Sequence, residues 1–148
     1  MFELESKNQD EIIVTTRSAT IKINTANAVI DANLAVGKIT GPGEFEIGDA
    51  TIRGIATASG KTIYDVEISG VHVGIIGGIE ENLDDLVADV LCTSSLRAVR
   101  EIEPKLVIAM GNVDAMVSEL KLTARTEKKL KIKNLDSLPN TKEVVVLN

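Results

Sequence analysis

The spacing of apolar residues changes once along this chain, near Glu80, and that change constrains the fold more than any single motif. Before Glu80, short segments such as Ala19–Asn24 and Thr62–Ile68 alternate apolar and polar residues, which is typical of half-buried β-strands. After Glu80, helical spacing alternates with apolar runs such as Lys105–Met110. Strands followed by helix–strand units predict a layered α/β protein with mixed sheets.

The first part reads as strands joined by short turns, with Gly41-Pro42-Gly43 and Gly48-Asp49 as the clearest turn signals. We expect these strands to form one antiparallel, meandering sheet over residues 1–76. The predicted strands are Phe2–Ser6, Ile12–Thr16, Ala19–Asn24, Ala28–Ile30, Leu34–Val36, Phe45–Ile47, Ala50–Ile55, Thr62–Ile68 and Val71–Ile76.

The second part is predicted to contain three short helices. Asn82 is positioned to cap the first, Ser94 or Ser95 caps a second that ends near Glu103, and the third covers Asp114–Leu120. The predicted strands between and after them are Asp89–Cys92, Lys105–Met110, Leu130–Ile132 and Val144–Leu147. Lys129 and Lys131 flank Leu130, as lysines do on an edge strand that must not pair with another sheet.

At 148 residues the chain is predicted to form a single domain over 1–148. A net charge of −6 and only three aromatic residues argue against nucleic acid as a partner. The longest apolar runs are far shorter than a membrane span, and no signal peptide is visible at the N-terminus. A lone cysteine in a chain without a signal peptide predicts a cytoplasmic protein. The short apolar runs predict that it does not enter a membrane.

The chain has one histidine, His72, and one cysteine, Cys92, which excludes disulfide scaffolds and zinc fingers. Alternation around Val71 and Val73 places His72 toward solvent, as a surface residue rather than a base or metal ligand. Cys92 ends a buried strand and is expected to act as a small apolar residue. Neither Ser94 nor Ser95 has the glycine neighbours of a nucleophile elbow, so helix capping is the simpler interpretation of both.

Two further clusters invite a functional interpretation. Four acids, Glu80, Glu81, Asp84 and Asp85, fall within six residues, but their spacing is not that of a calcium loop, and favourable charge at a helix start explains them. The glycines of Gly74–Gly78 follow a strand, yet they lack the G-x-G-x-x-G spacing of a dinucleotide loop. The sequence therefore assigns no catalytic, cofactor-binding or metal-binding residue.

Gly41–Ile55 (GPGEFEIGDATIRGI) resembles a segment of the Zn-dependent hydrolases of the metallo-β-lactamase superfamily, in the branch that includes the ascorbate-phosphate lactonases. The resemblance continues in order along the chain over roughly residues 41–147. It implies that family's fold, a β-sandwich with mixed sheets and few short helices, in a truncated form. The further matching segments are Thr62–Gly70, Val71–Glu81, Glu103–Met110 (EPKLVIAM) and Ser137–Leu147.

The metal ligands of that family do not carry over to this chain. Its H-x-H-x-D-H loop is absent, and the segment Thr25–Thr40 contains no histidine and looks shortened. The other implied ligand positions fall near Ala58 or Ser59, on Gly78 and on Gly111. His72 aligns with none of them. The resemblance therefore implies a shortened domain without the zinc site, which is not an enzyme and holds no cofactor.

Three functions are consistent with this reading. The first is a non-catalytic protein that acts through its surface, by self-association, with a dimer favoured, or by binding another protein. Its support is aliphatic richness and a terminal strand, Val144–Leu147, that lacks a long tail to protect it. The alternatives are a small-ligand protein that uses the Gly77-Gly78 loop, and a metal-independent hydrolase built from Ser59, Asp65, His72 or the acidic cluster.

Overall fold

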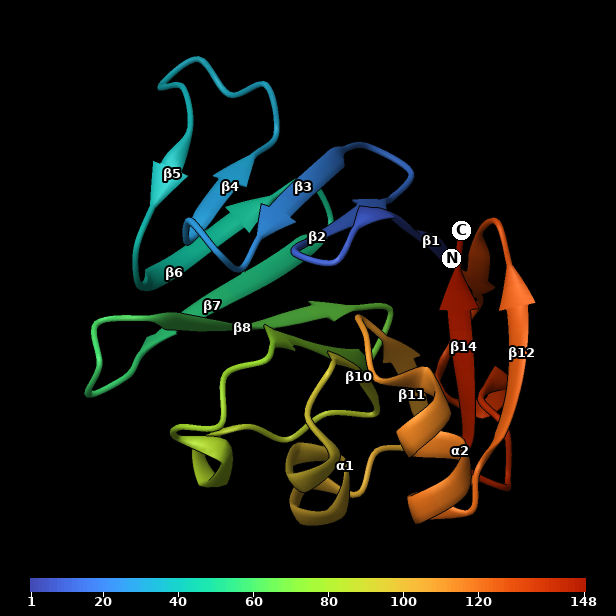
Figure 1. The fold of residues 1–148 in the computed structure, drawn as a ribbon. Helices are drawn as coiled ribbons and strands as arrows, with labels where there is room; N and C mark the ends of the chain where they lie inside the picture. Colours follow the sequence, from blue (N-terminus) through green and yellow to red (C-terminus); the bar gives the residue numbers. More distant parts are fainter.

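The computed structural model describes residues 1–148 and contains two packed β-sheets (Figure 1). Six strands form the first sheet: β1 (Phe2–Asn8), β2 (Glu11–Thr15), β3 (Thr20–Asn24), β4 (Val29–Asp31), β5 (Ile39–Thr40) and β13 (Leu130–Ile132). Their order is β13-β1-β2-β3-β4-β5, and all neighbours are antiparallel.

Eight strands form the second sheet: β6 (Gly43–Ile47), β7 (Ala50–Ala56), β8 (Thr62–Ile68), β9 (Val71–Gly77), β10 (Val90–Thr93), β11 (Leu106–Ala109), β12 (Thr123–Glu127) and β14 (Glu143–Leu147). Their order is β12-β14-β11-β10-β9-β8-β7-β6. The pairs from β12 to β9 are parallel and those from β9 to β6 are antiparallel, so the sheet is mixed as predicted.

The helices are short and lie on the face of the second sheet that points away from the first (Figure 1). They are the 3₁₀ turn η1 (Leu83–Asp85) and the helices α1 (Leu96–Ile102) and α2 (Val113–Leu120). A second 3₁₀ turn, η2 (Leu135–Ser137), precedes Leu138, which is buried in the cluster between the sheets. No helix in the structure has the length and apolar character that crossing a membrane requires.

Two apolar clusters hold the layers together. The larger contains 26 buried residues from both sheets, among them Phe2, Ile21 and Tyr64. The smaller contains 12 buried residues between the second sheet and the helices, among them Ile63 and Met116. Alternation along β8 explains the division, because Tyr64 and Ile63 point to opposite faces of the same strand.

Several expected elements differ from the observed ones. Residues 1–76 do not form one meandering sheet, because the chain passes from the first sheet to the second at Gly41–Gly43, where both glycines have positive φ. Leu34–Val36 is not a strand, and the strand at that end is Ile39–Thr40. Asn82 caps no helix with its side chain, since it adopts a left-handed conformation and precedes only a 3₁₀ turn.

The C-terminal strand also lies elsewhere than expected. β14 is an interior strand between β11 and β12, and its Val144, Val145 and Leu147 are buried. The strand β12, which the sequence did not predict, covers it and forms the edge of the second sheet. The lysine-flanked strand β13 is an edge of the first sheet, as predicted, and Glu3 lies 3.8 Å from Lys129 and 4.0 Å from Lys131.

Candidate functional site at the ends of β9, β10 and β11

The loops that follow β9, β10 and β11 converge at one end of the sandwich. The Thr93 hydroxyl donates to the Gly77 carbonyl at 2.6 Å, and the Ser94 N–H donates to the same oxygen at 2.9 Å. The Asn112 side-chain amide donates to the Ser94 carbonyl at 2.8 Å. These bonds tie the three carboxyl-terminal strand ends to one another, with Ser94 at the centre.

Three glycines at this end lie beside Ser94 or Thr25. A Cβ atom on Gly78 would lie 3.2 Å from Ser94 Oγ, and one on Gly111 would lie 3.4 Å from Ser94 Cβ. A Cβ atom on Gly77 would lie 2.7 Å from Thr25 Oγ1, at the end of β3. The structure therefore places Gly78 and Gly111, two of the implied ligand positions, on either side of the Ser94 side chain.

The third implied position, Ser59, lies in the β7–β8 turn and is bonded to Glu81. Its hydroxyl donates to Glu81 Oε1, and its N–H donates to Oε2 at 3.2 Å. The hydrogen bond from the Ser59 hydroxyl is the main cause that lowers the pKa of the Glu81 carboxyl. Ser59 therefore fastens the β7–β8 turn to the segment after β9, a contact between distant residues that no local pattern indicates.

The four acids do not converge on one point. Glu80 accepts a 2.5 Å hydrogen bond from Ser95 Oγ, and Glu81 binds Ser59. Asp85 accepts a 3.0 Å bond from the side-chain amide of Asn82. No three His, Cys, Asp or Glu side chains in the structure are grouped so that they could hold a metal ion.

The residues at this end do not fit a zinc centre of the kind that the resemblance implies. Zinc in proteins is held by imidazole, thiolate or carboxylate groups. Gly78 and Gly111 offer no side-chain donor, Ser59 is bonded to Glu81, and the single imidazole lies on a different part of the second sheet. The strand ends are instead tied together by hydrogen bonds to backbone carbonyls, which the Thr93 hydroxyl, the Ser94 N–H and the Asn112 side-chain amide donate.

His72 lies on the helix-side face of the second sheet, where its partner is Asp65. Its Nδ1 is 3.1 Å from Asp65 Oδ1, and its Nε2 is 3.7 Å from Glu67 Oε2. The side chain is 37% exposed, so the expected orientation away from Val71 and Val73 is correct. Arg53 Nη2 adds a 3.7 Å contact to Asp65.

These contacts test the constellation of Ser59, Asp65 and His72. Asp65 and His72 do meet, but the Ser59 hydroxyl is bonded to Glu81 and not to the imidazole. A serine nucleophile needs a base within hydrogen-bond reach. The structure therefore assembles an aspartate–histidine pair without the serine.

Cys92 and Ser95 occupy the structural roles that the sequence predicts. Cys92 is fully buried in the larger apolar cluster, and burial raises the pKa of its thiol far above the ordinary value. The thiolate is therefore not available as a nucleophile. Ser95 is the N-cap of α1, and its Oγ accepts a 3.0 Å hydrogen bond from the Ala98 N–H.

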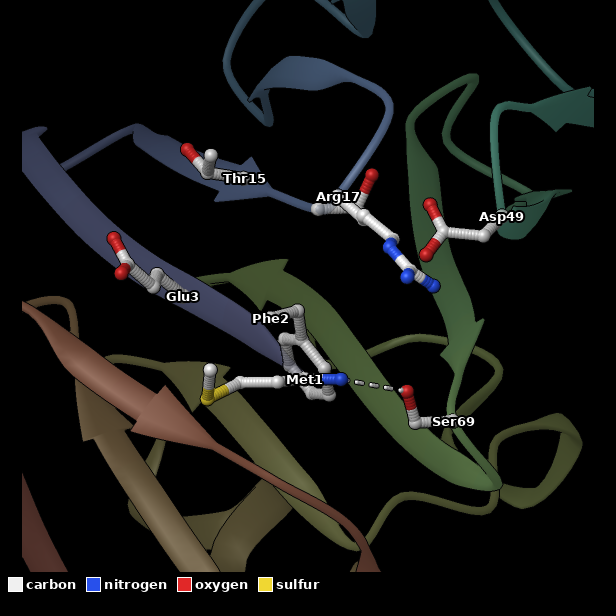
Figure 2. Close-up of a pocket in the computed structure, with 8 residues that line it drawn as sticks. Met1, Phe2, Glu3, Thr15, Arg17, Asp49 and Ser69 are labelled. Atoms are coloured by element: carbon white, nitrogen blue, oxygen red, sulfur yellow. Dashed lines mark hydrogen bonds between the residues drawn. The ribbon is translucent and has the colours of Figure 1, made fainter.

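A cavity of 520 Å³ opens at the opposite end of the sandwich (Figure 2). In Figure 2 the Arg17 side chain points toward Asp49, and the amino group of Met1 donates to Ser69 Oγ at 3.4 Å. A hydrogen bond from Thr16 is the main cause that lowers the pKa of Asp49. The positive charges of the Met1 amino group and Arg17 equal in number the negative charges of Asp49 and Glu3. Neither Gly77 nor Gly78 lines this cavity.

The comparisons with known proteins concern the fold. No protein-family model matches this chain, and no curated protein matches it in sequence. A crystal structure from Thermotoga maritima, described as that of a Zn-dependent hydrolase of the metallo-β-lactamase superfamily, is similar with a TM-score of 0.69 and 16% sequence identity. The match covers 99% of this chain and 99% of that chain. The protein thus has the metallo-β-lactamase fold that the resemblance implied.

Proposed function

We propose that this protein is a non-catalytic domain with the metallo-β-lactamase fold, which acts through its surface by self-association or by binding another protein. The observation that carries the proposal is the set of residues at the ends of β9, β10 and β11. There the implied ligand positions Gly78 and Gly111, which carry no donor side chain, lie against Ser94. Dinuclear metal hydrolysis requires several donor side chains around the metal ions, and these two positions supply none.

Two alternatives receive less support. A ligand site at the Gly77-Gly78 loop would need free polar groups, whereas the Gly77 carbonyl already accepts from the Thr93 hydroxyl and the Ser94 N–H. A metal-independent hydrolase would need a nucleophile beside His72, whereas its Nδ1 meets Asp65 and its Nε2 faces Glu67. Surface binding therefore remains the function that the geometry favours.

The surface itself indicates what kind of binding to expect. The accessible surface is 7511 Å², close to the roughly 7,300 Å² typical of a compact monomer of this mass. The exposed large apolar residues are few and come from separate segments of the chain: Met1, Val36, Val87, Val117 and Leu135. Association is therefore expected to rely on polar contacts or on sheet edges.

The proposal is tested by elemental analysis of the purified protein together with a panel of ester, lactone and phosphodiester substrates. We expect substoichiometric zinc and no turnover above that of a His72→Ala variant. Sedimentation velocity over a range of protein concentrations measures self-association in the same preparation. Stoichiometric zinc, or hydrolysis that His72→Ala abolishes, would overturn the non-catalytic assignment.

A further inference from the structure

The strand β12 is an open edge of the eight-stranded sheet (Figure 1). It pairs with β14 in parallel, with Thr123 beside Glu143 and Glu127 beside Leu147, and has no strand on its other side. Four of its five residues are exposed, Glu127 being half-buried. An edge of this length presents a row of unpaired backbone groups to which another strand can bind.

The direction of the β12 backbone groups follows from one hydrogen bond. The Asn148 N–H donates to the Glu127 carbonyl at 3.1 Å, so the Glu127 backbone faces the C-terminal strand. Backbone groups of successive residues in a strand point to opposite sides. The N–H and C=O groups of Ala124 and Thr126 therefore point outward, away from β14.

We propose that β12 is the dimerisation edge of this protein, where it pairs antiparallel with β12 of a second copy about a two-fold axis through Thr126. The inference rests on the proposed function, because it names the surface and the partner of self-association. In this register the two Thr126 residues exchange both backbone hydrogen bonds. Each Arg125 then lies opposite Glu127 of the other copy, in the non-hydrogen-bonded position where side chains approach most closely.

The charges on β12 are already arranged for this pairing. Arg125 and Glu127 are two residues apart and share one face of the strand. Arg125 Nη1 lies 2.7 Å from Glu127 Oε1, and its Nε lies 2.9 Å from Glu143 Oε1. Within one copy the guanidinium is thus bound by two carboxylates, and pairing about the two-fold axis brings Glu127 of the second copy opposite Arg125.

The other edges of the two sheets oppose self-pairing. Every antiparallel register of β6 with itself places Glu44 or Glu46 opposite a glutamate, and every register of β13 places Lys131 opposite a lysine. Like charges directly opposite one another destabilise a strand pair. β5 has only two residues. Among the four edges, β12 alone combines length with a charge pattern that is complementary to itself.

The experiment measures dimerisation of the full chain by sedimentation velocity and light scattering at increasing concentration. We expect the wild-type protein to dimerise, and Thr126→Pro to weaken dimerisation by at least about tenfold. Proline removes the outward N–H, which has no acceptor within the monomer. Thr51→Lys, on the exposed face of the interior strand β7, is the matched control and should dimerise like the wild-type protein.

A charge swap keeps the inference testable if Thr126→Pro perturbs the fold. Arg125→Glu should weaken the dimer, and the double variant Arg125→Glu/Glu127→Arg should restore it, with thermal unfolding of each variant as the check on the monomer. A wild-type protein that stays monomeric at all concentrations overturns the inference. A dimer that none of these variants weakens overturns the β12 assignment but leaves self-association intact, and zinc-dependent hydrolysis refutes the proposed function separately.

Discussion

At the scale of single residues, Tyr64 is the one buried side chain whose polar atom has no partner. Its hydroxyl lies within the larger apolar cluster and makes no hydrogen bond. A buried hydroxyl without a partner costs about 1–3 kcal/mol. We therefore expect Tyr64→Phe to raise the free energy of unfolding by about 1 kcal/mol in urea titrations at pH 7. A loss of stability would indicate that the hydroxyl has a partner in solution.

The same substitution should change the response to alkaline pH. Burial raises the pKa of Tyr64 to about 12, above its ordinary value of 10.0. The unfolded chain therefore ionises first, and the wild-type protein loses stability as the pH rises from about 10 toward 12. The stability advantage of Tyr64→Phe should grow over this range, and an advantage that stays constant would contradict the assignment.

The Ser59–Glu81 contact predicts an effect at acid pH. Because Ser59 lowers the pKa of Glu81, the contact stabilises the fold above the ordinary glutamate pKa of 4.5 and is lost as the pH falls below it. Ser59→Ala should therefore destabilise the protein at pH 7, and the difference from wild type should shrink below pH 4.5. Urea titrations of wild type, Ser59→Ala and the control Glu81→Gln measure this, and a pH-independent difference would argue against a carboxylate contact.

Single residues were predictable where the reason was local. The orientation of His72 follows from strand alternation, the burial of Cys92 from its apolar neighbours, and the capping by Ser95 from its place before a helix. The partners of Ser94 and Ser59 were not predictable. Ser94 packs against Gly78 and Gly111, and Ser59 binds Glu81, which is 22 residues away. Such contacts depend on the topology of the sheet and leave no mark on neighbouring residues.

At the scale of elements, Gly74 allows the η1 segment to pack on β9. A Cβ atom at this position would lie 2.9 Å from Leu86 Cδ2 and 3.1 Å from Ala88 Cβ. Gly74→Ala should therefore destabilise the protein by about 1–3 kcal/mol, as overpacking does. Leu86→Ala removes the nearest atom, so the double variant should lose less stability than the sum of the two single variants. Additive losses would show that the clash is relieved elsewhere.

Elements with strong apolar patterns were predicted well, and those without were missed. β8 has its predicted bounds, and α2 lies within one residue of its predicted start. β12 reads Thr-Ala-Arg-Thr-Glu and buries no residue, so it offers no apolar period to recognise. Its existence depends on β14, whose backbone supplies the hydrogen bonds. The absence of β12 from the prediction also explains why β14 was expected to be unprotected.

At the scale of the whole molecule, the layered α/β class was predictable and the division of strands between sheets was not. Alternation of apolar and polar residues indicates that a strand has one buried face, but it does not indicate which sheet the strand joins. The crossing from β5 to β6 occupies only Gly41 and Pro42, and such a turn is equally compatible with a hairpin within one sheet. Hence the first nine strands appeared to be a single meander.

The placement of the two apolar clusters predicts how the whole molecule unfolds. Both clusters share the eight-stranded sheet, with Tyr64 on one face of β8 and Ile63 on the other. Separating either layer from this sheet exposes a face of the same strands, so the layers should unfold together as the predicted single domain.

Tyr64 is the only tyrosine, and the chain has no tryptophan. Its fluorescence therefore reports the sandwich core alone, whereas far-ultraviolet circular dichroism reports all layers. We expect the two urea transitions to coincide at a fixed protein concentration, and to be unchanged by a metal chelator. Two separated midpoints would mean that the helix-side layer and the sandwich are independent folding units.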